Sequence, residues 1–173
     1  MIWFITGGAR SGKSKYARDS ALNLSSDPVH VATAVCNDKD HEFQDRVARH
    51  RADRDERWTS LEEPYHISRL SLENKVVVID CVTLWLTNFF AFYKYELQPS
   101  LLAFQEEIDR LLKINAIFLI VSNEIGMGLH ADTEIGRKFT DLQGWANQYV
   151  ANKAQKVVLM VSGIPLTLKN DEP

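Results

Sequence analysis

The sequence has little cysteine. Cys36 and Cys81 are its two cysteines, and their spacing matches neither a CxxC pair nor a zinc-ligand pattern. We therefore expect no disulfide framework and no cysteine-based zinc site, but two small thiols in a protein of a reducing compartment.

An excess of positive charge is also missing, since the formal net charge is −3. Proteins that coat nucleic acid or bind anionic membranes usually carry a basic surface. We expect no nucleic-acid partner, and any phosphate binding must be local.

Long apolar runs are absent as well. Residues 1–6 are apolar, yet they lead directly into a glycine-rich loop, without a basic lead-in and with too few residues to span a membrane. We therefore expect no signal peptide and no membrane span, and a cytoplasmic protein. No repeat or low-complexity stretch divides the sequence, so residues 1–173 are interpreted as one domain.

Short apolar, β-branched runs recur between helical segments. They are apolar at every position rather than alternating, which is typical of strands covered on both faces of a parallel sheet. The intervening segments are long enough for crossover helices. The sequence thus predicts a three-layer α/β fold of the P-loop type, with a mostly parallel sheet flanked by helices and strands at residues 2–6, 29–34, 76–79, 117–121 and 157–161.

Helical periodicity is clearest over residues 134–154. One apolar stripe is predicted to face the sheet, formed by Ile135, Phe139, Leu142, Ala146, Tyr149 and Val150. Residues 163–169 predict an edge strand after a turn, and residues 92–100 predict a surface loop between helices.

A strong phosphate-binding motif, G-x-x-x-x-G-K-[ST], follows the first strand and opens a helix. Glycines let backbone N–H groups converge on phosphate oxygens, and the helix N-terminus adds positive potential. Lys13 is expected to reach the β and γ phosphates, and Ser14 to ligate magnesium. The motif predicts binding of ATP or GTP by Gly7, Gly8, Ala9, Arg10, Ser11, Gly12, Lys13 and Ser14.

Two acidic residues follow apolar strands. Asp80 ends residues 76–79 in the manner of a Walker B carboxylate that holds magnesium, although such an acid is also a common strand end. Glu124 follows residues 117–121, at the carboxyl edge where ligands of open α/β sheets bind. The glycines after Glu124 permit close approach of backbone to a ligand, and a simple loop explains them nearly as well.

The signature of a GTPase switch is missing. Asn74-Lys75 is not followed by the aspartate of the guanine-reading N-K-x-D motif. Residues 141–144 mimic D-x-x-G, but they lie within the predicted amphipathic helix.

A basic helix is predicted between Asp38 and Glu56. Arg46, His50 and Arg54 recur at i, i+4 and i+8 and so share one side. Such a face can clamp a triphosphate or pyrophosphate, and the positive charges favour a neutral, nucleophilic imidazole. From the residues alone, a solvated charged helix explains the same pattern at least as well.

Six segments together resemble the bifunctional adenosylcobinamide kinase / adenosylcobinamide-phosphate guanylyltransferase family of cobalamin biosynthesis. The phosphate loop is shared with many kinases, but the R-x-x-x-H-R and N-E-x-G-M-G blocks in this order are specific. The segments span nearly the whole chain: Gly7 to Ser14, Val31 to Ala34, Arg46 to Arg51 with Arg54 and Trp58, Asp80 to Leu86, Ser122 to Gly128, and Val161 to Leu166.

The resemblance implies two reactions. ATP or GTP phosphorylates adenosylcobinamide, and GTP then transfers GMP to adenosylcobinamide phosphate through a guanylylated histidine, giving GDP-cobinamide and pyrophosphate. By position in the motif that histidine is His50, with Lys13 and Asp80 as further catalytic residues. Beyond the phosphate loop, the implied GTP contacts are Arg51, Ala52, Asp53, Arg54, Glu62 and Leu84, supported by Arg46 and Glu124.

The resemblance also implies Mg²⁺ as cofactor, held by Ser14 and Asp80, and a homotrimer. Residues 35–43 depart from the family pattern of an acid followed by methionine, so no contact is assigned there. On the residues alone, two other functions stay open: a plain small-molecule kinase of the P-loop class, and a nucleotide-binding regulatory module without turnover.

Overall fold

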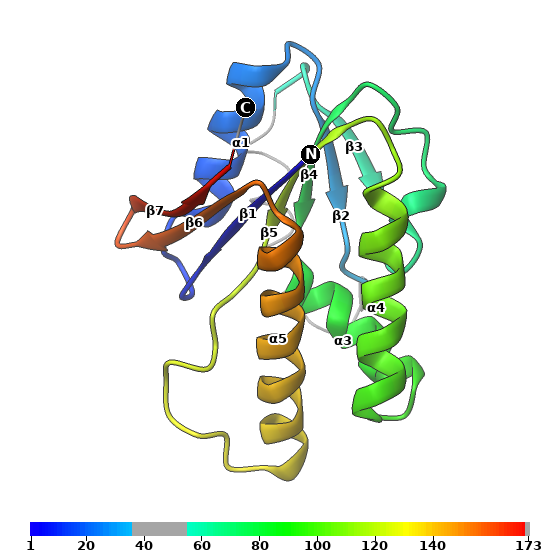
Figure 1. Cartoon of the computed structure of the whole chain (residues 1–173), viewed down its shortest axis with the longest axis vertical. Helices are drawn as coiled ribbons and strands as arrows, with labels where there is room; N and C mark the ends of the chain where they lie inside the picture. The colour runs from blue at the N-terminus through cyan, green and yellow to red at the C-terminus, as the bar shows by residue number, and fades with distance from the viewer. Residues whose placement is uncertain (36–54, 172–173) are drawn as a thin grey trace.

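The computed structural model describes residues 1–35 and 55–171. In this part of the chain, one sheet of seven strands has the order β3-β2-β4-β5-β1-β6-β7 (Figure 1). Neighbours from β3 to β6 pair in parallel, and β7 runs antiparallel to β6. The strands are β1 (Ile2–Gly7), β2 (Val29–Ala32), β3 (Thr59–Glu62), β4 (Val76–Asp80), β5 (Ile117–Val121), β6 (Lys156–Val161) and β7 (Ile164–Asn170).

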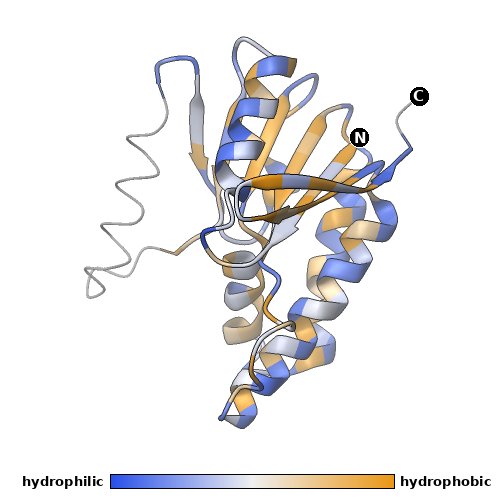
Figure 2. Ribbon diagram, turned by 90° about the vertical axis from the view of Figure 1, so that its left-hand side faces the viewer, coloured by the Kyte–Doolittle hydropathy of each residue, from blue (hydrophilic) through white to orange (hydrophobic). Residues whose placement is uncertain are grey.

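Helices cover both faces of this sheet. Alpha-helix α1 (Lys13–Leu24) packs on one face through Ala17 and Ala21. The other face is covered by α3 (Val82–Phe92), α4 (Leu97–Leu111) and α5 (Glu134–Lys153), with the 3-10 turn η1 (Ile67–Arg69) at their side. Figure 2 shows the mostly hydrophobic strands between these helices.

Two apolar cores follow from the pleat, because successive strand residues point to opposite faces. Phe4 joins the core under α3, α4 and α5, whereas Ile5 joins the core under α1. In the same way, Val77 joins the core under α3, α4 and α5, and Val78 joins the core under α1. The prediction of a three-layer α/β fold with a mostly parallel sheet is therefore confirmed.

Strand β3 had no counterpart in the sequence prediction. Its residues, Thr-Ser-Leu-Glu, are mixed in polarity, and three of the four side chains are exposed at the edge of the sheet. An edge strand needs apolar contacts on little of its surface, so its sequence carries only a weak hydrophobic pattern. The edge strand predicted at residues 163–169 is confirmed as β7.

The loop predicted at residues 92–100 is shorter than expected. The turn ends at Glu96, and α4 begins at Leu97, so Pro99 lies in the first helical turn. Proline is tolerated there because the first N–H groups of a helix have no partner within the helix. The apolar stripe of α5 is confirmed for Leu142, Ala146 and Val150, which are buried.

Ile135 was wrongly placed in that stripe, since 51% of it is exposed. Figure 1 gives the reason: the first turns of α5 extend past the ends of the strands, where no sheet lies beneath them. Among the described helices, none is long and apolar enough to cross a membrane.

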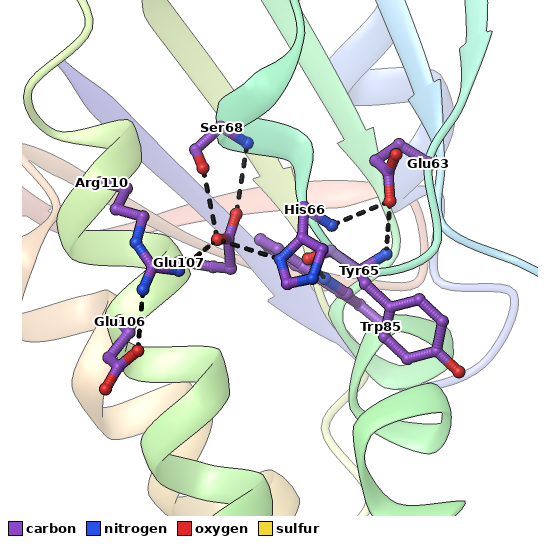
Figure 3. A network of polar contacts seen from close by, with 8 residues as sticks. All are labelled: Glu63, Tyr65, His66, Ser68, Trp85, Glu106, Glu107 and Arg110. Atoms are coloured by element: carbon purple, nitrogen blue, oxygen red, sulfur yellow. Dashed lines mark hydrogen bonds and ion pairs between the residues drawn. The ribbon is translucent and has the colours of Figure 1, made fainter. Parts of the chain in front are cut away.

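A buried carboxylate joins α4 to the turn after β3 (Figure 3). The side chain of Glu107 is 1% exposed, and its oxygens accept hydrogen bonds from the backbone N–H and the hydroxyl of Ser68, both at 3.2 Å. His66 Nδ1 lies 3.4 Å from the same carboxylate, and Arg110 pairs with it at 2.5 Å. Glu107 thereby fixes η1 against α4.

We predict that Glu107→Ala lowers the free energy of unfolding by about 1–3 kcal/mol, since it leaves the partly buried Ser68 N–H without its acceptor and removes the buried carboxylate that pairs with the half-exposed Arg110. Urea denaturation measures this loss. Glu106→Ala is the control, because Glu106 is half exposed and bonds only to Arg110, so its removal costs less than about 1 kcal/mol. An equal loss of unfolding free energy in the two variants would show that Glu107 stabilises the fold no more than an exposed ion pair does.

Candidate functional site

The loop from Gly7 to Ser14 joins β1 to α1 at the carboxyl edge of the sheet. Gly7 has a positive φ of 149°, and a Cβ there would lie 2.4 Å from the carbonyl oxygen of Met160. No side chain fits at that distance. Gly12 has φ 96° and is the N-cap of α1. Glycines at these two positions let the backbone turn back sharply over the strand end and expose its N–H groups.

Lys13 is buried at the start of α1, with 7% of its surface exposed. Its ammonium donates to the carbonyl oxygen of Gly8 at 2.6 Å and reaches the Ser11 hydroxyl at 3.5 Å. The ammonium is thus held over the loop. No acidic residue occupies the first turn of α1, so the positive end of the helix dipole is not offset there. Such a site attracts phosphate.

The exit of β5 runs beside this loop. The N–H of Ser122 donates to Ile5 O, and the N–H of Glu124 donates to Gly7 O, both at 2.9 Å. Glu124 therefore lies at the phosphate loop, as the sequence predicted for the sheet edge. Its carboxylate accepts the N–H of Gly126 at 2.8 Å and so closes the turn that follows.

Asp80 ends β4 at the same edge, where it pairs in register with Val121 of β5. Helix α3 begins two residues later, and Leu84 in its first turn packs partly buried on the α1 side of the sheet. Glu62 ends β3, whose exit is tied to β2 because Glu63 N–H donates to Ala32 O. Asp80, Leu84 and Glu62 thus share the carboxyl edge with the phosphate loop.

Cys81 is the N-cap of α3 and is buried next to Asp80. Burial raises the pKa of its thiol to about 11, and the negative charge of Asp80 adds to the shift. At neutral pH the group is therefore a protonated thiol rather than a nucleophilic thiolate. The other cysteine, Cys36, lies outside the described residues.

Most of the predicted basic helix, residues 38–54, also lies outside the described residues, and its last two residues, Asp55 and Glu56, are not helical. The undescribed part includes Arg46, His50, Arg51, Ala52, Asp53 and Arg54. The described chain before that segment leaves β2 at the carboxyl edge, and the described chain after it enters β3, which runs parallel to β2, from the opposite edge.

A set of buried polar side chains beneath this edge was missed in the sequence. Asn88 and Thr33 join β2, β3 and α3. A second group, Ser122, Gln143 and Asn147, joins β5 to α5. Gln143 and Asn147 lie four residues apart within the apolar stripe of α5, and that interruption of the stripe was the available signal.

A groove of about 230 Å³ opens beside the phosphate loop. Apolar side chains dominate its walls, and the exposed Met127 of the β5–α5 loop forms one rim. The lining residues are Gly8, Ser11, Glu124, Met127, Leu159, Met160, Val161 and Ser162.

The chain is similar to one protein family and to curated bifunctional proteins of adenosylcobalamin biosynthesis. A family model described as cobinamide kinase / cobinamide phosphate guanyltransferase matches residues 3–168. The bifunctional adenosylcobalamin biosynthesis protein CobP of Pseudomonas aeruginosa is 35% identical over 173 residues, with 96% of each chain covered. Its counterpart CobU of Escherichia coli K12 is 34% identical over 184 residues, covering 98% of this chain and 100% of that one.

Two solved structures share the fold at low sequence identity. One is an ATPase of the type III secretion system of pathogenic bacteria, with a TM-score of 0.53, 11% identity, and coverage of 91% of this chain and 50% of that one. The other is a protein of Pyrococcus horikoshii OT3, with a TM-score of 0.53, 10% identity, and coverage of 99% and 87%. At these identities they show the fold alone.

We predict that Lys13→Ala weakens binding of a non-hydrolysable GTP analogue by about 10- to 100-fold, because one charge-assisted contact to phosphate is worth about 1.5–3 kcal/mol. Isothermal titration calorimetry measures the loss. Lys15→Ala is the matched control, since Lys15 lies on the same helix but is exposed and paired with Asp19. Unchanged affinity in a folded Lys13→Ala protein would remove the phosphate site from this loop.

Proposed function

The chain belongs to the cobinamide kinase / cobinamide phosphate guanyltransferase family, and we propose from this that it catalyses both transfers on one phosphate loop. In the first, the γ-phosphoryl group of ATP or GTP passes to the hydroxyl of adenosylcobinamide. In the second, GMP passes from GTP to adenosylcobinamide phosphate. The observation that carries the proposal is the loop itself, with Lys13 held over it at the carboxyl edge of the sheet, which Asp80 and Glu124 share.

A magnesium ion fits this edge by the chemistry of its donors. Mg²⁺ keeps several waters and binds through one or two protein oxygens together with phosphates, so it needs no dedicated cage. Among the described residues no cluster of three acidic, histidine or cysteine side chains could hold a metal alone. Ser14 and Asp80 supply the two oxygen donors we assign to it. When bound, the ion neutralises charge on the phosphates.

Both reactions place a phosphorus atom under attack, so positioning and charge stabilisation supply most of the catalysis. In the kinase step the acceptor hydroxyl attacks the γ-phosphorus directly, and the nucleoside diphosphate leaves. No protein nucleophile is required for this transfer. Lys13 at the loop stabilises the negative charge on the phosphate oxygens.

Guanylyl transfer proceeds through His50 in this proposal. A ring nitrogen attacks the α-phosphorus of GTP, a P–N bond forms, and the bond to pyrophosphate breaks. An oxygen of adenosylcobinamide phosphate then attacks the same phosphorus, giving GDP-cobinamide and releasing the histidine. Arg51, Ala52, Asp53, Arg54, Glu62 and Leu84 are assigned to GTP, with Arg46 supporting. The Cys81 thiol at the same edge is no rival nucleophile, because it stays protonated.

We assign the apolar groove beside the loop to the body of the acceptor. Its walls include Gly8 and Ser11 of the phosphate loop, so a molecule seated there lies next to the reacting phosphates. Cobinamide carries its hydroxyl on an arm, and Met127, 81% exposed, offers a side chain that the acceptor would cover on binding.

We also propose that the protein forms a homotrimer. Beyond the groove, β7 exposes Ile164, Leu166 and Leu168 at the edge of the sheet. Apolar side chains that gather on an exposed face are typical of subunit contacts. The mass in solution, measured by light scattering, tests the trimer.

The two other functions have distinct outcomes. A plain kinase would phosphorylate cobinamide without taking label from α-labelled GTP. A regulatory module would bind nucleotide and do neither. The family assignment favours the bifunctional enzyme over both.

We predict that the wild type retains label from α-³²P-GTP after denaturation and that His50→Ala retains none. The label should be lost in acid and kept in base, as a phosphoramidate requires. Kinase turnover should stay within about twofold, because in-line γ transfer uses no protein nucleophile. His130→Ala is the control and should label normally, since His130 lies exposed in the β5–α5 loop. Mass spectrometry that places GMP on another residue would refute the histidine mechanism.

We predict that Met127→Asp raises the KM for adenosylcobinamide about tenfold or more, since burying a methionine side chain is worth about 1.5–3 kcal/mol. The KM for GTP should stay unchanged. Leu102→Asp on α4 is the control, because Leu102 is also exposed but lies outside the groove. An unchanged acceptor KM, or a Met127→Asp protein of altered mass in solution, would assign the loop to something other than the acceptor.

A further inference from the structure

The turn between β6 and β7 packs on the phosphate loop. β6 lies next to β1, and β7 forms the edge of the sheet (Figure 1). Ser162 and Gly163 alone join the two strands, and the N–H of Gly163 donates to the carbonyl oxygen of Ser11 at 3.0 Å. A Cβ on Gly12 would lie 3.3 Å from the Cα of Gly163. Two neighbouring residues of the loop therefore contact one residue of a turn that is remote in sequence.

The backbone of this turn favours particular residues. Ser162 and Gly163 have φ of 51° and 83°, as in the two-residue type I′ turns that join antiparallel strands. Glycine adopts this left-handed backbone freely and asparagine tolerates it, whereas a β-branched residue strongly disfavours it. Apart from its neighbours in the chain, no described atom lies within 4 Å of a Cβ built on Gly163. A side chain there is thus limited by the backbone and not by space.

The contact with Gly163 sets the direction of an N–H group in the loop. In a planar trans peptide, the C=O of one residue and the N–H of the next point in opposite directions. Because the Ser11 carbonyl points at the turn, the N–H of Gly12 points away from it. Gly12 is the N-cap of α1, and within the described chain its N–H donates to no acceptor. That N–H is available to a phosphate oxygen.

No other hydrogen bond in the described chain restrains the peptide that joins Ser11 to Gly12. The N–H of Ser11 donates to Gly8 O at 3.3 Å, and Gly12 O accepts the N–H of Tyr16 at 2.9 Å. Those bonds belong to the peptides before and after it. The bond from Gly163 is therefore the one that opposes rotation of this peptide.

We propose that Gly163 is a positioning residue for triphosphate binding, a role that rests on the proposed function. Its N–H holds the peptide between Ser11 and Gly12 in the orientation in which the Gly12 N–H meets the phosphates. When the turn changes its backbone, this peptide can rotate, and only the molecules in which it stays oriented bind the triphosphate. The apparent Kd is then the intrinsic Kd divided by the oriented fraction. Both transfers use the bound triphosphate, so both depend on this contact.

The test compares Gly163→Val and Gly163→Asn with the wild type. We expect Gly163→Val to raise the Kd of a non-hydrolysable GTP analogue about tenfold, because valine disfavours the left-handed backbone by a factor of this order. Isothermal titration calorimetry measures the change. At saturating GTP the kcat should stay within about threefold, since the loss is one of binding. Gly163→Asn keeps both the backbone and the N–H and should bind within about twofold of the wild type.

Lys94→Val is the matched control. Lys94 is exposed in the turn between α3 and α4 and also has a left-handed backbone, with φ 52°. Valine there introduces the same kind of strain in helices on the sheet face opposite α1. We expect it to lower the urea midpoint of unfolding while the Kd of the analogue stays unchanged. If Gly163→Val fails to fold, Gly163→Ala imposes less strain and should raise the Kd by about threefold.

Hydrogen exchange tests the contact in the wild type. Coupling is reciprocal, so a nucleotide that requires the oriented peptide must also stabilise the hydrogen bond from Gly163. We expect the Gly163 amide to exchange at least about fivefold more slowly when the analogue is bound. The amide of Lys94, which donates to Ala91 O in the remote turn, should change less than about twofold.

An unchanged Kd in folded Gly163→Val would overturn the proposal, as would an equal loss of affinity in Lys94→Val. An equal loss in Gly163→Asn would also overturn it, because the added side chain and not the backbone would then be the cause. Exchange of the Gly163 amide that ignores the analogue would do the same. A wild type that binds the analogue but transfers neither group would instead refute the proposed function, while the binding and exchange data would still decide the role of Gly163.

Discussion

The close approach of the phosphate loop to β6 constrains the rest of the site. Because a Cβ on Gly7 would stand 2.4 Å from the Met160 carbonyl, the chain can turn over the end of β1 only with glycine at this position. That turn places Gly12 at the start of α1 and brings Lys13 over the loop. The helix N-terminus and the ammonium then lie together at the sheet edge, and their combined positive potential is suited to phosphate.

The parallel sheet places the remaining groups along the same edge. Parallel strands all end at one edge, so Asp80, Glu62 and the exit of β5 lie along it although they are far apart in sequence. Strand ends by themselves leave side chains loosely placed. Here, buried amides and hydroxyls beneath the edge tie the exits of β2 and β3 to α3 through Asn88, and the exit of β5 to α5 through Asn147. The helix layer therefore fixes the site as well as covering the core.

The two proposed reactions fit this arrangement because they share a bound triphosphate and differ in the phosphorus attacked. The β5 side of the edge adjoins the phosphate loop and the apolar groove, where an acceptor and a γ-phosphate would meet. The β2 and β3 side leads to the residues that the family resemblance assigns to guanylyl transfer.

The sequence alone determined the phosphate loop, five of the strands, the edge strand β7 and the family, because each depends on a local pattern. Strand β3 escaped prediction, since an exposed edge strand needs no continuous apolar run. Ile135 was misplaced because periodicity states which residues share a face, whereas the tertiary structure decides how far the sheet beneath extends. Pro99 lies within α4 because it falls in the first turn, where the backbone N–H that proline lacks has no partner within the helix. Only the tertiary structure could show Asn88 bonded to Thr33 and Pro64, because such contacts join segments 55 and 24 residues apart and leave no periodic trace in the sequence.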